Sequence, residues 1–493
     1  MGQGQIRKGF FFYFGLFVLL LISVFLVCLV IMMFNPGKTV LWMKYFTDNN
    51  VYKYETTTDG SETPIDFSSL SGINIKCNSY AKVTLKRNKD ANMPLDIVYI
   101  VSKAKGFGTH KSDVNFVYNI RKEGSVLHIE VDEPDGFLFF SRNIEIVLNA
   151  HTNRSYNFSN IALNVETGSG NIEIGREYAG SQEVALKSLK AKTASGDIIF
   201  GQTFNSSALT SCELTTSGGD IKGYREITYL DGTTKKGQGI ALNCDANIDI
   251  GNGWLGMDAI SMGSRTLNIK SKKGTVDVDC IVAGETSVQC HEGNYYVDSV
   301  RGNLSFDPAE DTLASPNIVA GFISGNFDVS SVGGTPDVTV KEIGGKFSLV
   351  ADKGKVLVKN AKGEVEIDGE GTLSADITFG ENYSRQARIK NNAGELNVKF
   401  LGGILGSGNI IVQTNKSVVN VKVTIAAGFV ATAKKSDGSM LADDKININV
   451  GLNKGQSKNP LDVVGTVGGK GTINITTNAK VNYELVEKST LVA

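Results

Sequence analysis

Residues 323–367 read "ISGNFDVSSVGGTPDVTVKEIGGKFSLVADKGKVLVKNAKGEVEI", and this stretch decides the fold. Glycine recurs in it, followed by one polar residue and then by apolar residues at alternate positions, as in "GNFDV" and "GKFSL". Alternation with a period of two is typical of a strand that buries one face. Gly345, Gly354 and Gly363 lie 9 residues apart. The stretch therefore predicts strands of about five residues, separated by glycine turns.

The same pattern, Gly-x-apolar-x-apolar, occurs along most of the chain. It begins at Gly170, Gly196, Gly274, Gly293, Gly302, Gly325, Gly345, Gly354, Gly363, Gly394, Gly408 and Gly471. A propeller would repeat about every 40 to 50 residues, and an immunoglobulin-like sandwich would show a Cys-Trp-Cys core. Neither pattern is present in the sequence. The spacing favours an all-β chain with a parallel β-solenoid at 161–427, whose coils of about 20 residues stack about 4.8 Å apart.

The cysteines are consistent with this interpretation. Five of them share the parity of the neighbouring apolar residues: Cys77, Cys212, Cys244, Cys280 and Cys290. We expect them inside the coils as small buried hydrophobes rather than in a disulfide framework. Oxidation of a stacked pair outside the cell stays open as an alternative.

The two ends of the β region differ from its middle. Residues 71–160 contain longer strands without the tight glycine repeat, and regularity is lost again from 428 onward. Because an open solenoid end exposes strand edges, a divergent end segment is typical of a cap. We interpret 71–160 as a β-rich N-terminal cap and 428–493 as a C-terminal β cap and tail.

A long apolar segment precedes the β region. Residues 10–34 read "FFFYFGLFVLLLISVFLVCLVIMMF", without one charge, which is long enough for a helix to cross a bilayer core of about 30 Å. The following "MMFNPGK" lacks the small residues of a signal-peptide cleavage site. We expect a transmembrane signal anchor at 10–34, a cytoplasmic segment at 1–9 and a linker at 35–70. The predicted location is the cell membrane, with a single pass and an extracytoplasmic body.

Composition excludes several function classes. Lys+Arg 50 against Asp+Glu 51 gives a net charge of -1, which argues against a nucleic-acid partner because phosphates need a basic face. The chain has four histidines and no paired Cys-x-x-Cys spacing, so we expect no metal site. No cofactor is expected either.

Four segments carry a family resemblance: "GSGNIEI" (168–174), "ASGDIIF" (194–200), "TSGGDIKG" (216–223) and "ISGNFDV" (323–329). They resemble the Ser-Gly-Asn/Asp-apolar signature of the bacterial putative-adhesin family, which is auto-transporter-adhesin-like. The resemblance covers residues 71–412 and implies a β-solenoid head with a more sandwich-like start. It brings no catalytic residues. "YREITYLDGTTKKGQG" (224–239) and "GNGWLGMDAISMGSRT" (251–266) depart from the pattern, and we interpret them as loop insertions.

Trp254 and Tyr296 are the candidate binding residues, because flat rings suit sugar faces and protein patches. Parity places Tyr295 inside and Tyr296 outside. Outward acids such as Asp277 and Asp279 are typical of any solvated strand, so we expect no catalytic residues and no enzyme. The favoured function is non-enzymatic surface binding or adhesion, to a glycan or a protein on a cell surface or in the envelope. A structural or assembly component of the cell envelope is the second possibility, and a carbohydrate-active enzyme is the third.

Overall fold

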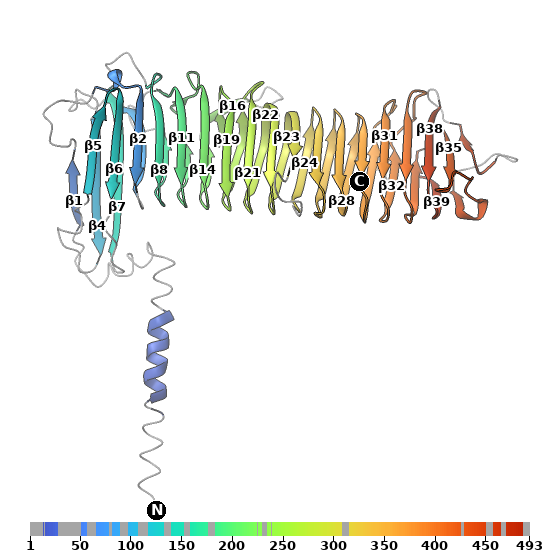
Figure 1. Ribbon diagram of the computed structural model, residues 1–493, viewed down its shortest axis with the longest axis horizontal. Helices are drawn as coiled ribbons and strands as arrows, with labels where there is room; N and C mark the ends of the chain where they lie inside the picture. The colour runs from blue at the N-terminus through green and yellow to red at the C-terminus, as the bar shows by residue number, and fades with distance from the viewer. Residues whose placement is uncertain are drawn as a thin grey trace, which may run out of the picture.

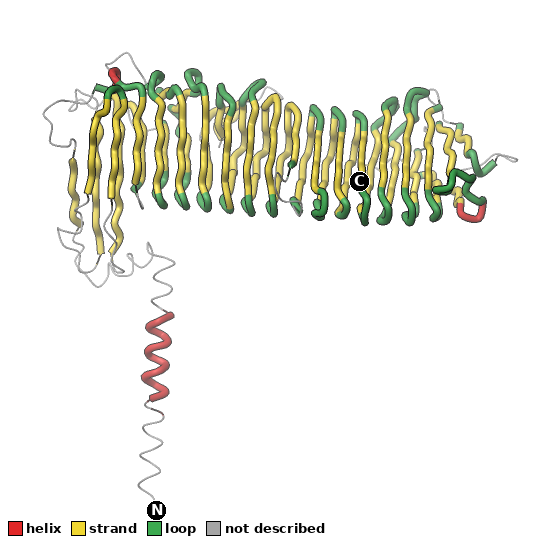
Figure 2. The backbone as a smooth tube through the Cα atoms, in the orientation of Figure 1, coloured by secondary structure: helices red, strands yellow, loops and turns green. Residues whose placement is uncertain are grey.

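The computed structural model describes residues 13, 15–27, 51–56, 66–77, 81–88, 97–106, 117–132, 140–151, 158–175, 183–223, 225–228, 234–237, 239–307, 315–424, 428–449, 457–464 and 470–486. Its β body is an elongated rod in which the strands run across the long axis (Figure 1). Turns and loops lie along the two edges of the rod, with the strands between them (Figure 2).

Most strands stack in two columns, which we name the first and the second column. In stacking order the first column contains β5 (Val117–Glu123), β6 (Val126–Asp132), β2 (Gly72–Cys77), β8 (Ala162–Thr167), β11 (Ser188–Thr193), β14 (Ser211–Thr216), β19 (Ala246–Gly251), β21 (Thr266–Ser271), the ends of β22 (Thr275–Cys290) and β23 (Asn294–Phe306), β25 (Phe327–Ser331), β27 (Phe347–Ala351), β29 (Val365–Asp368), β31 (Gln386–Lys390), β33 (Asn409–Gln413), β38 (Gly471–Thr476), β35 (Phe429–Lys434) and β37 (Leu461–Val463).

The second column contains, in stacking order, β1 (Val51–Thr56), β4 (Ile97–Gly106), β7 (Phe140–His151), β3 (Lys82–Asn88), β9 (Ile172–Ile174), β12 (Ile198–Phe200), β15 (Asp220–Gly223), β20 (Trp254–Ser261), the starts of β22 and β23, β24 (Asn317–Ile323), β26 (Asp337–Ile343), β28 (Gly354–Ala361), β30 (Leu373–Phe379), β32 (Leu396–Phe400), β34 (Val419–Val423), β39 (Val481–Leu485) and β36 (Ile446–Asn449). Among the described strands of the two columns, pairing is antiparallel at the ends, in β1–β4, β4–β7, β5–β6 and β35–β37.

Several short elements lie beside the columns. β10 (Val184–Ala185) and β13 (Phe204–Asn205) pair with each other in parallel, outside the columns. Two 3-10 turns, η1 (Phe67–Ser69) and η3 (Asp443–Lys445), lie just before β2 and β36.

Each coil contributes one strand to each column, and the core runs between the columns. Phe327 pairs with Phe347, and Phe347 with Val365, so these coils advance by 20 and 18 residues. Alternate residues point inward and are buried, and the rings of Phe327 and Phe347 stack with centroids 5.4 Å apart. Cys77, Cys212, Cys244 and Cys290 are buried in the main core, as their parity predicts, whereas Cys280 is buried in a separate small cluster with Ala259. The prediction of a mostly β chain with a long parallel sheet is confirmed, and the coils are consistent with a β-solenoid.

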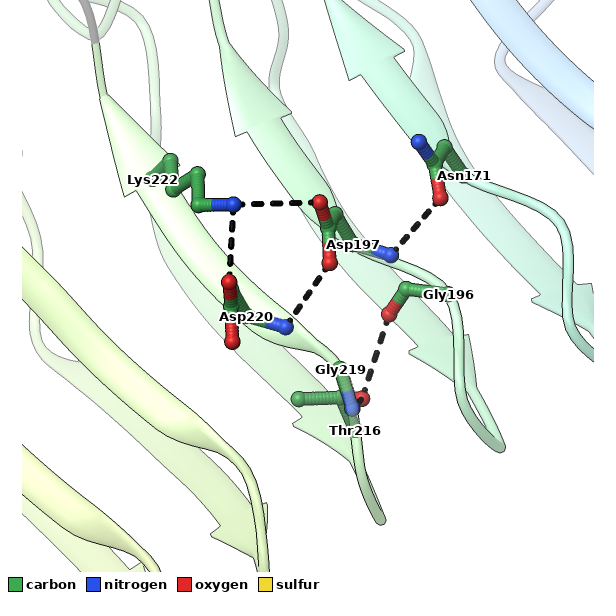
Figure 3. A network of polar contacts seen from close by, with 7 residues as sticks. All are labelled: Asn171, Gly196, Asp197, Thr216, Gly219, Asp220 and Lys222. Carbon is green, nitrogen blue, oxygen red and sulfur yellow. Dashed lines mark hydrogen bonds and ion pairs between the residues drawn. The ribbon is translucent and has the colours of Figure 1, made fainter. Parts of the chain in front are cut away.

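Buried hydroxyl groups hold the glycine turns in a repeated pattern (Figure 3). The backbone N–H of Gly196 donates to Thr193 Oγ1 at 3.0 Å, and that of Gly219 donates to Thr216 Oγ1 at 2.9 Å. Thr216 Oγ1 also donates to the carbonyl oxygen of Gly196 in the preceding coil, at 3.2 Å. A methyl group on Gly219 would clash with that same carbonyl oxygen. Glycine is required here because the turns of successive coils touch.

The residue after the glycine links one coil to the next. The side-chain oxygen of Asn171 accepts the backbone N–H of Asp197 at 2.9 Å, and Asp197 in turn accepts the backbone N–H of Asp220 at 2.9 Å (Figure 3). Farther along the rod, Asn303 accepts the N–H of Asn326 at 2.8 Å. Asn and Asp recur after the glycine because their short side chains carry an acceptor that reaches the neighbouring turn.

An insertion interrupts one coil without disturbing the stack. β15 pairs with the first residues of β20, and β18 (Gly239–Ala241) pairs with its last residues, so the two short strands together match one continuous strand. Between them, β16 (Arg225–Thr228) and β17 (Thr234–Gly237) form an antiparallel hairpin. The predicted insertion at 224–239 is confirmed. The one predicted at 251–266 is wrong: this segment contains β20, whose Gly256 and Met257 blur the alternation of a strand that is buried on one face.

At both ends of the rod the coil order departs from the chain order. The coil of β2 and β3 lies between that of β6 and β7 and that of β8 and β9. At the other end, the coil of β38 and β39 lies between that of β33 and β34 and that of β35 and β36. The predicted cap at 71–160 thus contains one end coil and one coil from inside the stack.

Residues 15–27 are helical, and their large apolar side chains are exposed. No helix among the described residues is both long and apolar enough to cross a membrane. The rest of the predicted anchor at 10–34, apart from Tyr13, lies outside the described residues, as do residues 1–9 and most of the predicted linker at 35–70.

Candidate binding face

Trp254 and Tyr296 lie on the same side of the rod. Trp254 begins β20 and Tyr296 lies in β23, both in the second column, and each side chain is 38% exposed. Tyr295 points into the core, where its ring packs edge-on against Phe306 with centroids 4.8 Å apart. The parity prediction for this tyrosine pair is therefore confirmed.

The indole of Trp254 covers Gly256. A methyl group on Gly256 would clash with three carbons of the six-membered ring of this indole. Because Trp254 and Gly256 are two residues apart on one strand, they share its outer face. The missing side chain of Gly256 is what lets the indole occupy this position, where Trp254 is 38% exposed. Glycine in a strand often marks such a close approach.

The register places Gly256 beside Asp277, and Asp277 beside Tyr296. Val319 follows Tyr296 in the next strand. The Trp254 indole over Gly256, then Asp277, Tyr296 and Val319 form a line across four successive strands, which we name the aromatic row. At about 4.8 Å per strand, the two rings are separated by about 10 Å.

The polar groups of the aromatic row are exposed to ligand. Asp277 is exposed and has no ion-pair partner among the described residues. Asn317 Nδ2 donates to the hydroxyl oxygen of Tyr296 at 3.4 Å, a long contact. Phe322, farther along β24, is 37% exposed. Two ring faces on either side of a carboxylate suit a ligand with flat apolar faces and hydroxyl or amide donors.

Sequence reasoning identified both rings but not their partners. Gly256 and Asp277 were not among the candidates, although the parity of "WLG" already placed Gly256 on the same face as Trp254. The alignment of Asp277 with Tyr296 depends on which strands stack, and single-strand parity does not contain that information.

Two hollows on the rod are polar instead. One of about 660 Å³ lies on the first column and is lined mainly by outward polar residues of β14, β19, β21 and β22, among them Glu213, Asn247, Asp249, Asn268 and Lys270. The other, of about 620 Å³, lies on the second column near its C-terminal end. A ladder of amides lines it, in which Asn420 donates to Asn397, Asn482 to Asn420 and Asn447 to Asn482, at 2.8 to 2.9 Å.

Charges in the second hollow are compensated. Lys399 Nζ lies 2.7 Å from an Asp376 carboxylate oxygen, and Lys422 Nζ lies 3.7 Å from Glu484. Neither hollow presents an exposed aromatic ring. Within the described part of the chain, no group of three or more His, Cys, Asp or Glu side chains is arranged to hold a metal ion. The aromatic row is therefore the better candidate for recognition.

No family model matches the chain, and no curated protein matches it. Among solved structures, a putative cell adhesion protein from Clostridium sporogenes aligns over 89% of this chain and 100% of its own, with 8% identity and a TM-score of 0.15. A TM-score this low does not indicate a shared fold, so the argument on function depends on the residues described above.

Proposed function

We propose that the chain is a membrane-anchored, non-enzymatic surface protein that binds or adheres through the aromatic row. The observation that carries this proposal is the alignment of Trp254, Asp277 and Tyr296 on one exposed face. Both rings are held by backbone that is fixed in the column, so little conformational entropy is lost when a ligand stacks on them. The proposed ligand is a glycan or protein of a cell surface or envelope.

The proposed anchor is the apolar segment at 10–34. The side chains of Leu16, Phe17, Leu19 and Phe25 within it are more than half exposed, although such groups are normally buried. A lipid environment would remove this apolar surface from water. In this proposal the anchor holds the β body outside the cytoplasm, and several anchored copies raise the avidity of weak contacts.

The test uses the full chain inserted in fluorescent lipid vesicles and titrated onto whole cells and isolated envelope material. We expect saturable binding that Trp254→Ala or Tyr296→Ala weakens at least about tenfold, a loss of about 1.4 kcal/mol. Gly256→Ala is the sharpest variant, because it keeps both aromatic residues but displaces the indole from its position over Gly256. Val350→Ala, at an exposed position of β27 in the first column, is the matched control and should bind normally.

The outcomes separate the alternatives. Equal binding by all four variants would exclude the aromatic row as the contact surface. Absence of saturable binding to every material would overturn adhesion. The exposed side chains of Val319, in the row, and Phe322, farther along β24, favour an envelope assembly role as the second candidate, since proteins bury such apolar groups when they associate. Crosslinking of the native envelope to one partner protein, lost in Phe322→Ala, would support that role.

A further inference from the structure

The first complete coil to follow the proposed anchor is not at the end of the stack, although β1, which precedes it, pairs only with β4 among the described strands. β2 pairs in parallel with β6 on one side and with β8 on the other, and all six of its residues are in register with both. β3 is likewise flanked by β7 and β9. In a solenoid whose coils stack in chain order, the first coil would have one neighbour only.

Side chains fix the entry of the chain into this coil. Ile73 and Ile75 of β2 are buried in the core. Just before β2, the ring of Phe67 is fully buried and packs against Phe158 with centroids 5.3 Å apart. Asp66 caps the η1 turn by accepting the backbone N–H of Ser68 at 3.0 Å. The segment 66–77 is therefore held by contacts on several sides.

The other end of the rod has the same arrangement. β38 lies between β33 and β35, and β39 lies between β34 and β36. Ile473 and Ile475 of β38 and Val481 of β39 are buried. At both ends, the coil nearest the chain terminus lies inside the stack, and strands farther from that terminus in the sequence cover it.

We propose that these inserted coils give the body a mechanical function: they let it bear tension applied at its chain ends without unravelling coil by coil. The proposal rests on the proposed membrane anchor, which would load the N-terminus whenever a surface-bound ligand is pulled. A coil at the end of the stack has one neighbouring coil, so its strands can detach from that neighbour one at a time. An inserted coil that leaves alone must break both of its interfaces together. If it leaves with the covering strands β6 and β7, its pairings to β8 and β9 must break together.

The number of strand pairings that resist pulling depends on where the force is applied. Pulling at the N-terminus first detaches β1, which pairs with β4 at the edge of the second column. The load then reaches Phe67 and β2, whose backbone hydrogen bonds to β6 and β8 all oppose extraction. Pulling instead at the β5–β6 turn moves that hairpin as a unit and breaks only the β6–β2 interface. The same set of coils thus offers one strong and one weak attachment point.

The experiment is single-molecule pulling on the full-length chain in detergent, with one handle at the C-terminus. The second handle is placed at the N-terminus or, as the matched control, at a cysteine introduced as Glu123→Cys, an exposed position beside the β5–β6 turn. After β1 detaches, we expect the next step from the N-terminus to need about twice the force of the first step from position 123, since two pairings break instead of one. Equal or lower force from the N-terminus would overturn the proposal.

Hydrogen exchange without force provides a second readout. Amides of β2 should exchange as slowly as those of β8, and more slowly than those of β5, because local opening begins at the covering coil. Fast exchange in β2 would contradict the proposal that β2 is held from both sides, whatever force the pulling experiment gives. Neither measurement involves a ligand. Loss of binding in Trp254→Ala would therefore leave the unfolding force and the exchange rates unchanged. Failure of the mechanical proposal would likewise leave the binding result unchanged.

Discussion

The carboxylate of Asp197 accepts the backbone N–H of Asp220 in the next coil, with oxygen and nitrogen 2.9 Å apart. The other oxygen of the same carboxylate lies 3.2 Å from Lys222 Nζ, which also contacts Asp220 at 2.7 Å (Figure 3). Hydrogen bonds and charge on one side chain therefore join two turns. This contact gives the Ser-Gly-Asn/Asp signature a physical role in stacking coils.

Asp197→Ala should lower the free energy of unfolding by about 1 to 2 kcal/mol, because the N–H of Asp220 loses its acceptor. Asp197→Asn is the matched control: it keeps the acceptor that Asn171 provides one coil earlier, and it loses only the ion pair with Lys222. It should lie within about 0.5 kcal/mol of the wild type. Urea denaturation with unchanged slope measures both, and equal losses would show that the charge, not the acceptor, matters.

Gly219→Ala should be the more damaging of two adjacent substitutions. Its methyl group would clash with the carbonyl oxygen of Gly196, and backbone cannot move aside cheaply, so we expect a loss of about 3 kcal/mol. The nearest atom to a methyl group on Gly218 is 3.9 Å away, so Gly218→Ala should be neutral or slightly stabilising. Thermal unfolding of the two variants measures this difference in stability. A similar loss in both would argue against close packing of the turns.

Phe347→Ala should cost about 3 to 5 kcal/mol, since it opens a cavity in the continuous core beside Phe327. Phe347→Leu should cost less, because most of the volume remains filled. Equilibrium denaturation measures the free energy of unfolding of both variants. Little loss in Phe347→Ala would mean that neighbouring coils collapse into the space.

Stability should fall in alkaline solution in part through Cys290. Burial raises the pKa of this thiol from the ordinary 9.0 to about 11, although the N–H of Gly293 opposes the shift. Because the folded-state pKa is the higher one, the stabilisation is complete below pH 9 and is lost as the pH rises from 9 through 11. Between pH 8 and 10.5, the wild type should lose about 2 kcal/mol more than Cys290→Ala. Equal losses would mean that the thiol is not buried.

Local features of the fold were predictable because they depend on a few neighbouring residues. Alternation around Tyr295 and four of the five cysteines gave the buried face correctly, since a strand has a period of two; at Cys280 the alternation shifts, and the main core contains Ile281 instead. The order of coils at the ends was not predictable in this way. Every coil presents a similar apolar face and similar turns, so any coil can stack on any other as far as the pattern is concerned, and only three-dimensional packing decides that β2 lies between β6 and β8.

The candidate site was half predictable for the same reason. Exposure of Trp254 and Tyr296 follows from residue type and parity. Their alignment with Asp277 depends on the number of residues in each coil, which varies with insertions such as the β16–β17 hairpin. The sequence predicts an insertion at 251–266 because this segment departs from the Ser-Gly-Asn/Asp pattern, yet the segment is a strand whose Gly256 leaves room for the indole.

The β16–β17 hairpin leaves the coil at Gly223 and returns at Gly239. A methyl group on Gly223 would clash with the carbonyl oxygen of Gly239, so the two ends of the inserted segment touch. The stack therefore receives the same backbone whatever the segment between these glycines contains. This position is a natural acceptor for foreign sequence: a loop, a peptide tag or a small domain whose own termini are adjacent can replace residues 224–238 while the register of β15, β18 and β20 is retained.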